Sequence, residues 1–171
     1  MWPDRRLIDL LGVETPIIQA PMAGSNNAEL VIAVSEAGGL GSLPCAMLSP
    51  EQARAQTGVI RQRTSKPINL NFFCHTPPTP DAAREQGWKN RLAPYYRELG
   101  LDPAAPVATP TRAPFDDAMA DLVEEFKPEA VSFHFGLPEQ RLLDRVRRVG
   151  AKILSSATTV AEARWLEERG C

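Results

Sequence analysis

Four short segments of the chain carry side chains that could do chemistry, and each follows an apolar run of the kind that forms a buried strand. In parallel α/β proteins, ligands bind at the carboxyl ends of the strands. We therefore expect the four segments to lie at one edge of a sheet. They are Gln19–Gly24, Leu43–Ala46, Asn71–His75 and His134–Gly136.

The histidine and asparagine at two of these strand ends suit different chemistry. His134 follows the apolar run 130–133, where an imidazole can transfer a proton or stabilise an anion. Asn71 points the same way as Asn69 along a strand, and its carboxamide offers a donor and an acceptor to a flavin ring edge. A lone histidine is more often structural, and an asparagine here could instead satisfy nearby loop backbone. His75 opens a proline-rich stretch, so a loop-stabilising or lid role is expected for it.

The first segment offers backbone groups rather than side chains. Pro21 cannot donate to a strand ladder, so the strand ends there and peptide groups of Ala20, Pro21 and Met22 stay free for a ligand. The alternative is a strand-to-helix turn in which Met22 plugs the end of a barrel. The glycines of 38–41 follow a helix and precede a strand, whereas a phosphate cradle needs the opposite order, so we expect a helix stop and close packing.

Apolar runs and amphipathic helical patterns alternate along the chain, which predicts parallel strands joined by right-handed crossovers. The expected strands are 17–20, 40–43, 68–72, 130–133 and 152–155, and the expected helices are 28–37, 50–63, 116–126, 142–149 and 159–169. Asn26 or Asn27 is expected to cap the first helix, and Ser49 with Gln52 forms a capping box for the second. A proline-rich insertion at about 74–115, with one helix near 88–99, suits a lid or binding loop.

Two architectures accommodate five βα units. One is an open doubly wound sheet, and the other is part of a (β/α)₈ barrel, which takes about 250 residues. The five units use all 171 residues, and the last helix ends where another strand would begin. The expectation is therefore a small open sheet or a barrel truncated at its C-terminus, and periodicity does not choose between them.

Composition narrows the classes of partner. The net charge is −2 without long runs of like charge, so no nucleic-acid partner is expected. No apolar stretch approaches the roughly 18 residues of a membrane span, and no signal peptide is evident, so no membrane partner is expected. Cys45, Cys74 and Cys171 lie far apart, which favours free thiols over disulfides or a metal site and predicts a cytoplasmic protein.

Taken together, the segments closely resemble motifs of the FMN-dependent nitronate monooxygenases, formerly called 2-nitropropane dioxygenases. The motifs occur in the family's order and spacing, and they are Pro16–Gly24, Gly38–Leu43, Asn69–Phe73 and Val131–Gly136. The first motif is shared by related FMN barrels, whereas the histidine and asparagine motifs together are more specific. The family's later glycine-rich motifs, which bind the FMN phosphate, have no counterpart in this chain.

The resemblance implies an α/β fold, a partial (β/α)₈ TIM barrel of about five βα units truncated at the C-terminus. Residues 1–171 would form the N-terminal part of one FMN-binding domain, with the insertion at about 74–115. Ala20, Pro21 and Met22 would approach the flavin ring. Asn71 would hydrogen-bond the FMN, and His134 matches the family's catalytic histidine.

The implied reaction is the oxidation of alkyl nitronates or nitroalkanes by O₂ to a carbonyl compound and nitrite, with FMN supplying the redox chemistry. The fragment itself is expected to be weakly active or inactive, and to self-associate through its exposed barrel edge. Two alternatives stay open. One is another FMN barrel oxidoreductase, such as an NADH-dependent enoyl-acyl-carrier reductase, and the other is a non-catalytic fragment.

Overall fold

The computed structural model describes residues 2–106 and 112–171, which divide into two compact units. The larger unit comprises Met1–His75 and Thr111–Cys171, and the smaller comprises Thr76–Pro110. The insertion expected at about 74–115 contains the smaller unit, and its residues 107–111 lie outside the described part. The candidate site residues all belong to the larger unit.

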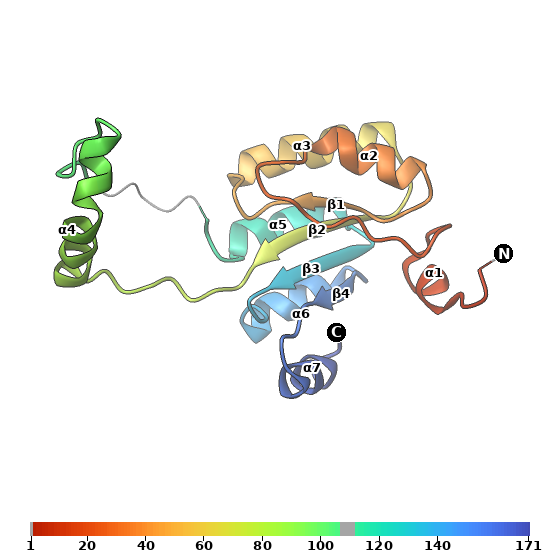
Figure 1. The fold of residues 1–171 in the computed structure, drawn as a ribbon. Coiled ribbons are helices and arrows are strands. Elements are labelled where there is room, and N and C mark those ends of the chain that lie inside the picture. The colour runs from red at the N-terminus through yellow and green to blue at the C-terminus, as the bar shows by residue number, and fades with distance from the viewer. Residues whose placement is uncertain (1, 107–111) are drawn as a thin grey trace. The chain divides into compact units, whose positions relative to one another are not determined.

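A four-stranded parallel sheet forms the centre of the larger unit (Figure 1). Its strands follow the chain in the order β1-β2-β3-β4, and they are β1 (Gly41–Pro44), β2 (Ile68–Phe73), β3 (Ala130–His134) and β4 (Lys152–Ser155). A doubly wound sheet reverses its strand order at a switch point. The sequential order seen here is instead that of consecutive βα units in a barrel.

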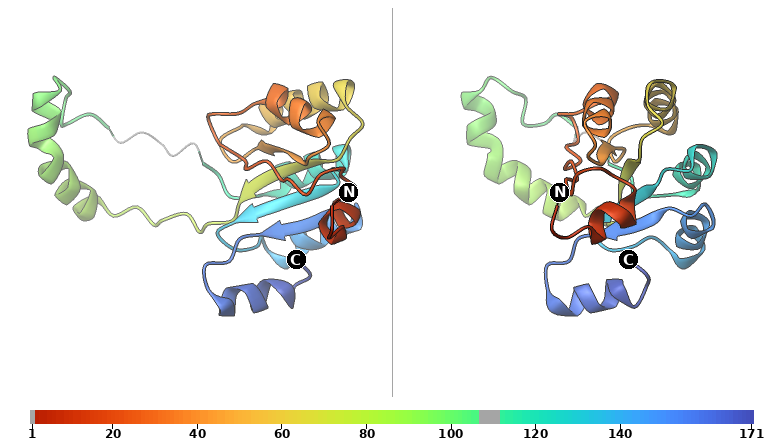
Figure 2. Two further views of the ribbon diagram at one scale, coloured as in Figure 1. Left: turned by 45° about the vertical axis from the view of Figure 1, so that its right-hand side comes forward. Right: turned by 90° about the vertical axis from the view of Figure 1, so that its right-hand side faces the viewer.

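Four helices lie along the same side of this sheet and alternate with its strands (Figure 2). They are α2 (Ala28–Glu36), α3 (Pro50–Arg63), α5 (Asp117–Phe126) and α6 (Gln140–Arg148). The expected caps are confirmed, because the Asn27 side chain accepts from Glu29 N and Ser49 forms the capping box with Gln52. These caps define where α2 and α3 begin.

Three further helices complete the described elements, and they are α1 (Arg6–Leu11), α4 (Ala82–Glu98) and α7 (Val160–Glu167). No helix was expected at α1, which is only 6 residues long. α4 is the helix of the smaller unit, and it begins at its Asp81 cap rather than near Trp88 as expected. None of the described helices is both long and apolar enough to cross a membrane.

Alternation along the strands separates an apolar face from a polar face. The apolar face packs against the four helices and contributes Leu43, Ile68, Leu70, Phe72, Val131, Phe133 and Ile153 to the main core. The opposite face, called the inner face below, carries Ser42, Asn69, Asn71, Ser132 and His134. A second, smaller core of Leu11, Val13, Leu40 and Ala130 is separate from the main one.

The expected strand at 17–20 is wrong as a strand and as a buried segment. It forms a single parallel bridge between Ile18 and Leu40, and its two isoleucines are 56% and 40% exposed. The Gln19 side chain accepts from Ser42 N at 3.1 Å and donates to Ser42 O at 3.2 Å. The Gln19 side chain therefore binds the main-chain N and O of Ser42, which a longer strand pairing would have used.

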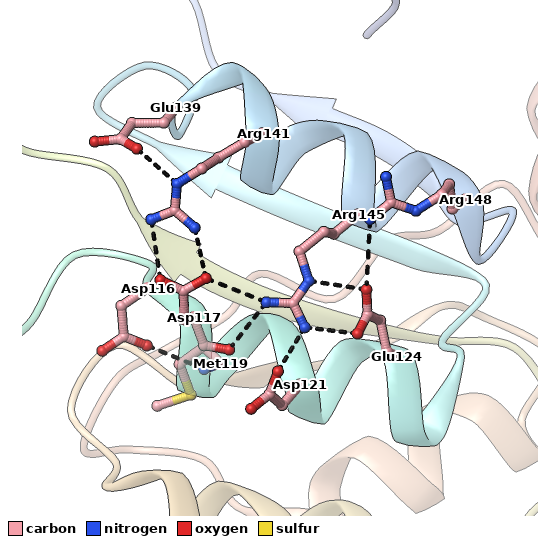
Figure 3. Close-up of polar contacts among 9 residues, drawn as sticks. All are labelled: Asp116, Asp117, Met119, Asp121, Glu124, Glu139, Arg141, Arg145 and Arg148. Atoms are coloured by element: carbon pink, nitrogen blue, oxygen red, sulfur yellow. Dashed lines mark hydrogen bonds and ion pairs between the residues drawn. The ribbon is translucent and has the colours of Figure 1, made fainter.

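Ion pairs join α5 to α6 on the outer surface (Figure 3). Arg145 binds both oxygens of Glu124 at 2.8 and 2.6 Å and also pairs with Asp121. Arg141 binds both oxygens of Asp117. These guanidinium groups hold the pKa of the Asp117 and Glu124 carboxyls below their usual range through direct hydrogen bonds. These ion pairs therefore hold α5 and α6 side by side.

Candidate functional site

The inner face holds a buried network of amides and hydroxyls. Asn69 donates to Ser42 Oγ at 3.0 Å and to Ser132 Oγ at 2.8 Å, while Asn71 donates to the same Ser132 Oγ at 2.9 Å. Because β2 and β3 pair with Asn71 opposite Ser132, the strand register itself brings these groups together. Asn69 Oδ1 is buried without a hydrogen-bond partner in the described chain.

Asn71 lies where the sequence places it, at the carboxyl end of β2 and 2% exposed. Its Nδ2 is committed to Ser132, whose main-chain oxygen lies 3.3 Å away. No donor reaches Asn71 Oδ1 within residues 2–106 and 112–171, which leaves an acceptor directed to the inner face. The Asn71 Nδ2 is therefore bound by Ser132, whereas its Oδ1 is available to accept from a ligand.

His134 ends β3 and is half-buried. Its Nδ1 lies 2.9 Å from Ser156 Oγ, directly after the end of β4. The ring meets Phe73, its partner in the strand register, edge-on at 6.1 Å between centroids. The sequence missed Ser156, although the carboxyl-end rule applied to the strand 152–155 would have identified it.

Aromatic side chains surround this histidine. Phe135 is 65% exposed and packs edge-on against Phe73 at 5.0 Å. Its φ of 67° is a left-handed conformation that is costly for a bulky residue, and such strain concentrates at functional sites. His75 lies 6.4 Å from the Phe135 ring, so both histidines border one aromatic cluster.

The Ala20–Met22 segment lies beside β1. Asn26 fixes it, because Asn26 Oδ1 accepts from Met22 N at 2.9 Å and Asn26 Nδ2 donates to Ser42 O at 3.0 Å. Met22 is 42% exposed, so its side chain does not plug the end of the sheet in this chain. Met22 N is already bonded, and the segment can meet a ligand through its other backbone groups and by van der Waals contact.

The fourth segment, Leu43–Ala46, separates from the inner face. Cys45 and Ala46 border a cavity of about 360 Å³ on the helix side, between the starts of α3 and α5, with Phe72 and Phe115 in its wall. Cys45 is fully buried, and burial raises the pKa of its thiol to about 12. A thiol in that state is neither a nucleophile nor a ligand at neutral pH.

The candidate groups at this edge of the sheet can bind a polar ligand. They comprise a carboxamide acceptor on the inner face, an imidazole at the end of β3 and the peptide groups of the Ala20–Met22 segment beside β1. The described residues gather no group of three or more His, Cys, Asp or Glu suited to a metal ion.

Comparisons with known proteins agree with this arrangement. A family model described as nitronate monooxygenase matches residues 4–171. A nitronate monooxygenase of Paraburkholderia phytofirmans is 43% identical over 97% of the chain, and one of Pseudomonas aeruginosa is 40% identical over 96%. The chain spans about half the length of these relatives, 46% and 47% respectively.

Solved structures show the same fold. A nitroalkane oxidase from Streptomyces ansochromogenes superposes with a TM-score of 0.77 at 32% identity, over 96% of this chain and 46% of that one. FabK from Thermotoga maritima gives 0.69 at 25% identity, over 97% of this chain and 41% of that one. The expected partial (β/α)₈ barrel is thereby confirmed over the open sheet.

Proposed function

The chain belongs to the nitronate monooxygenase family, an enzyme family, and from that premise we propose that it supplies the flavin-ring side of an FMN-dependent active site. The reaction proposed for the whole protein is the oxidation of alkyl nitronates by O₂ to a carbonyl compound and nitrite. Residues 1–171 would be the N-terminal part of one barrel domain, with the insertion at about 74–115. Bound FMN would supply the electron-transfer chemistry.

The observation that carries this proposal is the pairing of Phe73 with His134 and of Asn71 with Ser132 in one register. This pairing supports a site in which the Asn71 carboxamide and the His134 imidazole lie on the same face of adjacent strands. His134 is two residues beyond Ser132, the residue that pairs with Asn71. Asn71 would bind the ring edge through its Oδ1. Ala20, Pro21 and Met22 would contact the ring from the side of β1.

His134 would contact the substrate. Its ring is half-buried among aromatic groups, where a hydrogen bond to an anion is stronger than in open water. Two roles are compatible with the position: a donor to the nitronate oxygens, or a base for the α-proton of a neutral nitroalkane.

An absorbance spectrum of the purified chain after incubation with FMN tests the cofactor, and anaerobic addition of propyl-1-nitronate tests the substrate. For the chain by itself, the expected result is weak FMN binding with slow or partial bleaching of the flavin that is bound. A protein that FMN cannot reconstitute would show that this chain is not a working enzyme by itself. In that case the non-catalytic alternative would hold for the chain.

His134→Ala tests the catalytic assignment, with His75→Ala as the matched control because these are the only two histidines. We expect His134→Ala to lower turnover of nitronate by about a hundredfold or more, the lower range for a positioned acid–base or hydrogen-bonding group, and His75→Ala to have little effect. Equal activities in the two variants would refute the assignment.

The second candidate function is that of another FMN barrel oxidoreductase, such as an NADH-dependent enoyl-acyl-carrier reductase. The structural likeness to FabK supports it, although at lower identity than the likeness to the nitroalkane oxidase. Rapid oxidation of NADH by the flavin-loaded protein, without response to nitronate, would favour this candidate.

Two physical properties are proposed for residues 1–171 tested by themselves. They would supply the ring side of the FMN site, whereas barrel phosphate sites form after strands 7 and 8, so their affinity for FMN should be lower than that of a complete barrel. β4 pairs with β3 alone, and its open edge is a template for association with another copy. Light scattering over a range of concentrations tests this, and a strictly monomeric protein with tight FMN binding would refute both properties.

A further inference from the structure

We propose that Ser156 is a positioning residue that donates its hydroxyl proton to His134 Nδ1 and thereby keeps the ring proton on Nε2. The strand register creates the contact. Phe133 pairs with Ser155, so the next residues along the two parallel strands, His134 and Ser156, are neighbours at the carboxyl edge. The two side-chain atoms lie 2.9 Å apart, within ordinary hydrogen-bond distance.

The backbone on both sides of Ser156 is held in place. Before it, Ser155 Oγ donates to Phe133 O at 3.1 Å and ties the end of β4 to β3. After it, Thr159 forms the capping box of α7 with Glu162, which also accepts from Thr158. Ser156 therefore sits on a short segment fixed at each end, as a group that orients another side chain requires.

The nature of the partner indicates the direction of the bond. A general-base histidine carries its proton on Nδ1 and donates it to a carboxylate or carbonyl, which leaves Nε2 as the base. At His134 the partner is a hydroxyl, which can donate as well as accept. Ser156 is exposed, and His134 Nδ1 is the one acceptor that its hydroxyl reaches within residues 2–106 and 112–171. Because a neutral imidazole nitrogen is a stronger acceptor than a water oxygen, we assign the hydroxyl proton to Nδ1. The neutral ring then carries its proton on Nε2.

This tautomer selects one class of substrate, an inference that rests on the proposed function. An Nε2–H group can donate to an oxygen of a nitronate anion, whereas it has no lone pair to remove the α-proton of a neutral nitroalkane. No hydrogen bond engages Nε2 within the part of the chain that the structure describes. His134 is therefore assigned to binding the preformed anion, not to generating it.

Nitrogen NMR of the imidazole rings tests the tautomer without flavin, nitronate or oxygen, so its result is separate from that of the proposed activity. The chain has two histidines, and His75→Gln removes one set of signals to assign the other. At about pH 8.5, where an ordinary imidazole is neutral, we expect His134 Nδ1 to be pyridine-type and Nε2 to be pyrrole-type.

Three serine variants complete the test. Ser156→Ala should shift both ring nitrogens toward the values of a tautomer mixture, while Ser156→Thr, which keeps the hydroxyl, should restore the single tautomer. Ser155→Ala is the matched control, because it removes the neighbouring hydroxyl without touching the ring. A pyrrole-type Nδ1 in the unaltered chain would overturn the proposal. So would a spectrum unchanged by Ser156→Ala, or one changed equally by Ser155→Ala.

Discussion

Replacing Ser132 with alanine tests how the inner face is held together. The variant removes one oxygen and creates little empty volume, but that oxygen accepts from two buried amides, those of Asn69 and Asn71. Asn69 would keep Ser42 Oγ, and Asn71 would keep only the main-chain oxygen at 3.3 Å. With each lost bond worth about 0.5–1.5 kcal/mol, the free energy of unfolding should fall by about 1–3 kcal/mol.

Urea denaturation followed by far-UV circular dichroism measures this cost, and the melting temperature should fall by about 2–12 °C for a chain of this length. Ser155→Ala is the control, because it removes one hydroxyl with a single half-buried bond and should cost about 1 kcal/mol or less. In an Asn71→Ala background, Ser132→Ala should cost less than in the unaltered chain, because the two residues are coupled. A cost no larger than that of the control, or one that adds fully to that of Asn71→Ala, would refute the network.

Three further outcomes follow from other parts of the chain. Gly41→Ala places a Cβ 2.3 Å from a main-chain oxygen of α2, and the free energy of unfolding in urea should fall by about 3 kcal/mol or more. Gly58 lies in open space on α3, so Gly58→Ala should raise the free energy of unfolding by about 0.5–1 kcal/mol. Cys45, with its pKa raised to about 12 and its side chain buried, should escape thiol labelling near pH 8 until the chain is denatured. Arg145 lowers the pKa of Glu124, so the pair stabilises the fold above the ordinary carboxyl range and loses this effect as pH falls through the lowered value. The melting temperatures of the unaltered chain and Arg145→Ala should therefore differ at neutral pH, and the difference should begin to shrink as pH falls below about 4.3.

The elements that the sequence predicted well have local signals. The capping box at Ser49 and the cap at Asn27 are set by residues within three positions of each other, and the structure confirms both. The segment 17–20 shows where local reasoning fails. Its apolar run predicts a buried strand, but a distant contact, Gln19 with Ser42, decides how much of the ladder forms.

The candidate site was predictable in part for the same reason. The carboxyl-end rule identified Asn71 and His134, because it needs only the position of each strand. The groups that hold them, Ser132 and Ser156, depend on strand register, which pairs residues 61 and 22 positions apart. Ser132 lies within a strand and carries no local signal of such a role, so only the tertiary pairing reveals it. Ser156 directly follows β4, where the carboxyl-end rule would have identified its position but not its partner.

The inner face positions its candidate site residues with neutral partners. Ser132 holds the amide of Asn71, and Ser156 holds the imidazole of His134, where many active sites use a carboxylate. A carboxylate there would repel an anion through a medium of low dielectric constant, where like charges a few ångströms apart interact strongly. Hydroxyls fix the same geometry without that cost. An inner face built this way imposes no charge repulsion on an anionic ligand, which agrees with the anionic substrate proposed above.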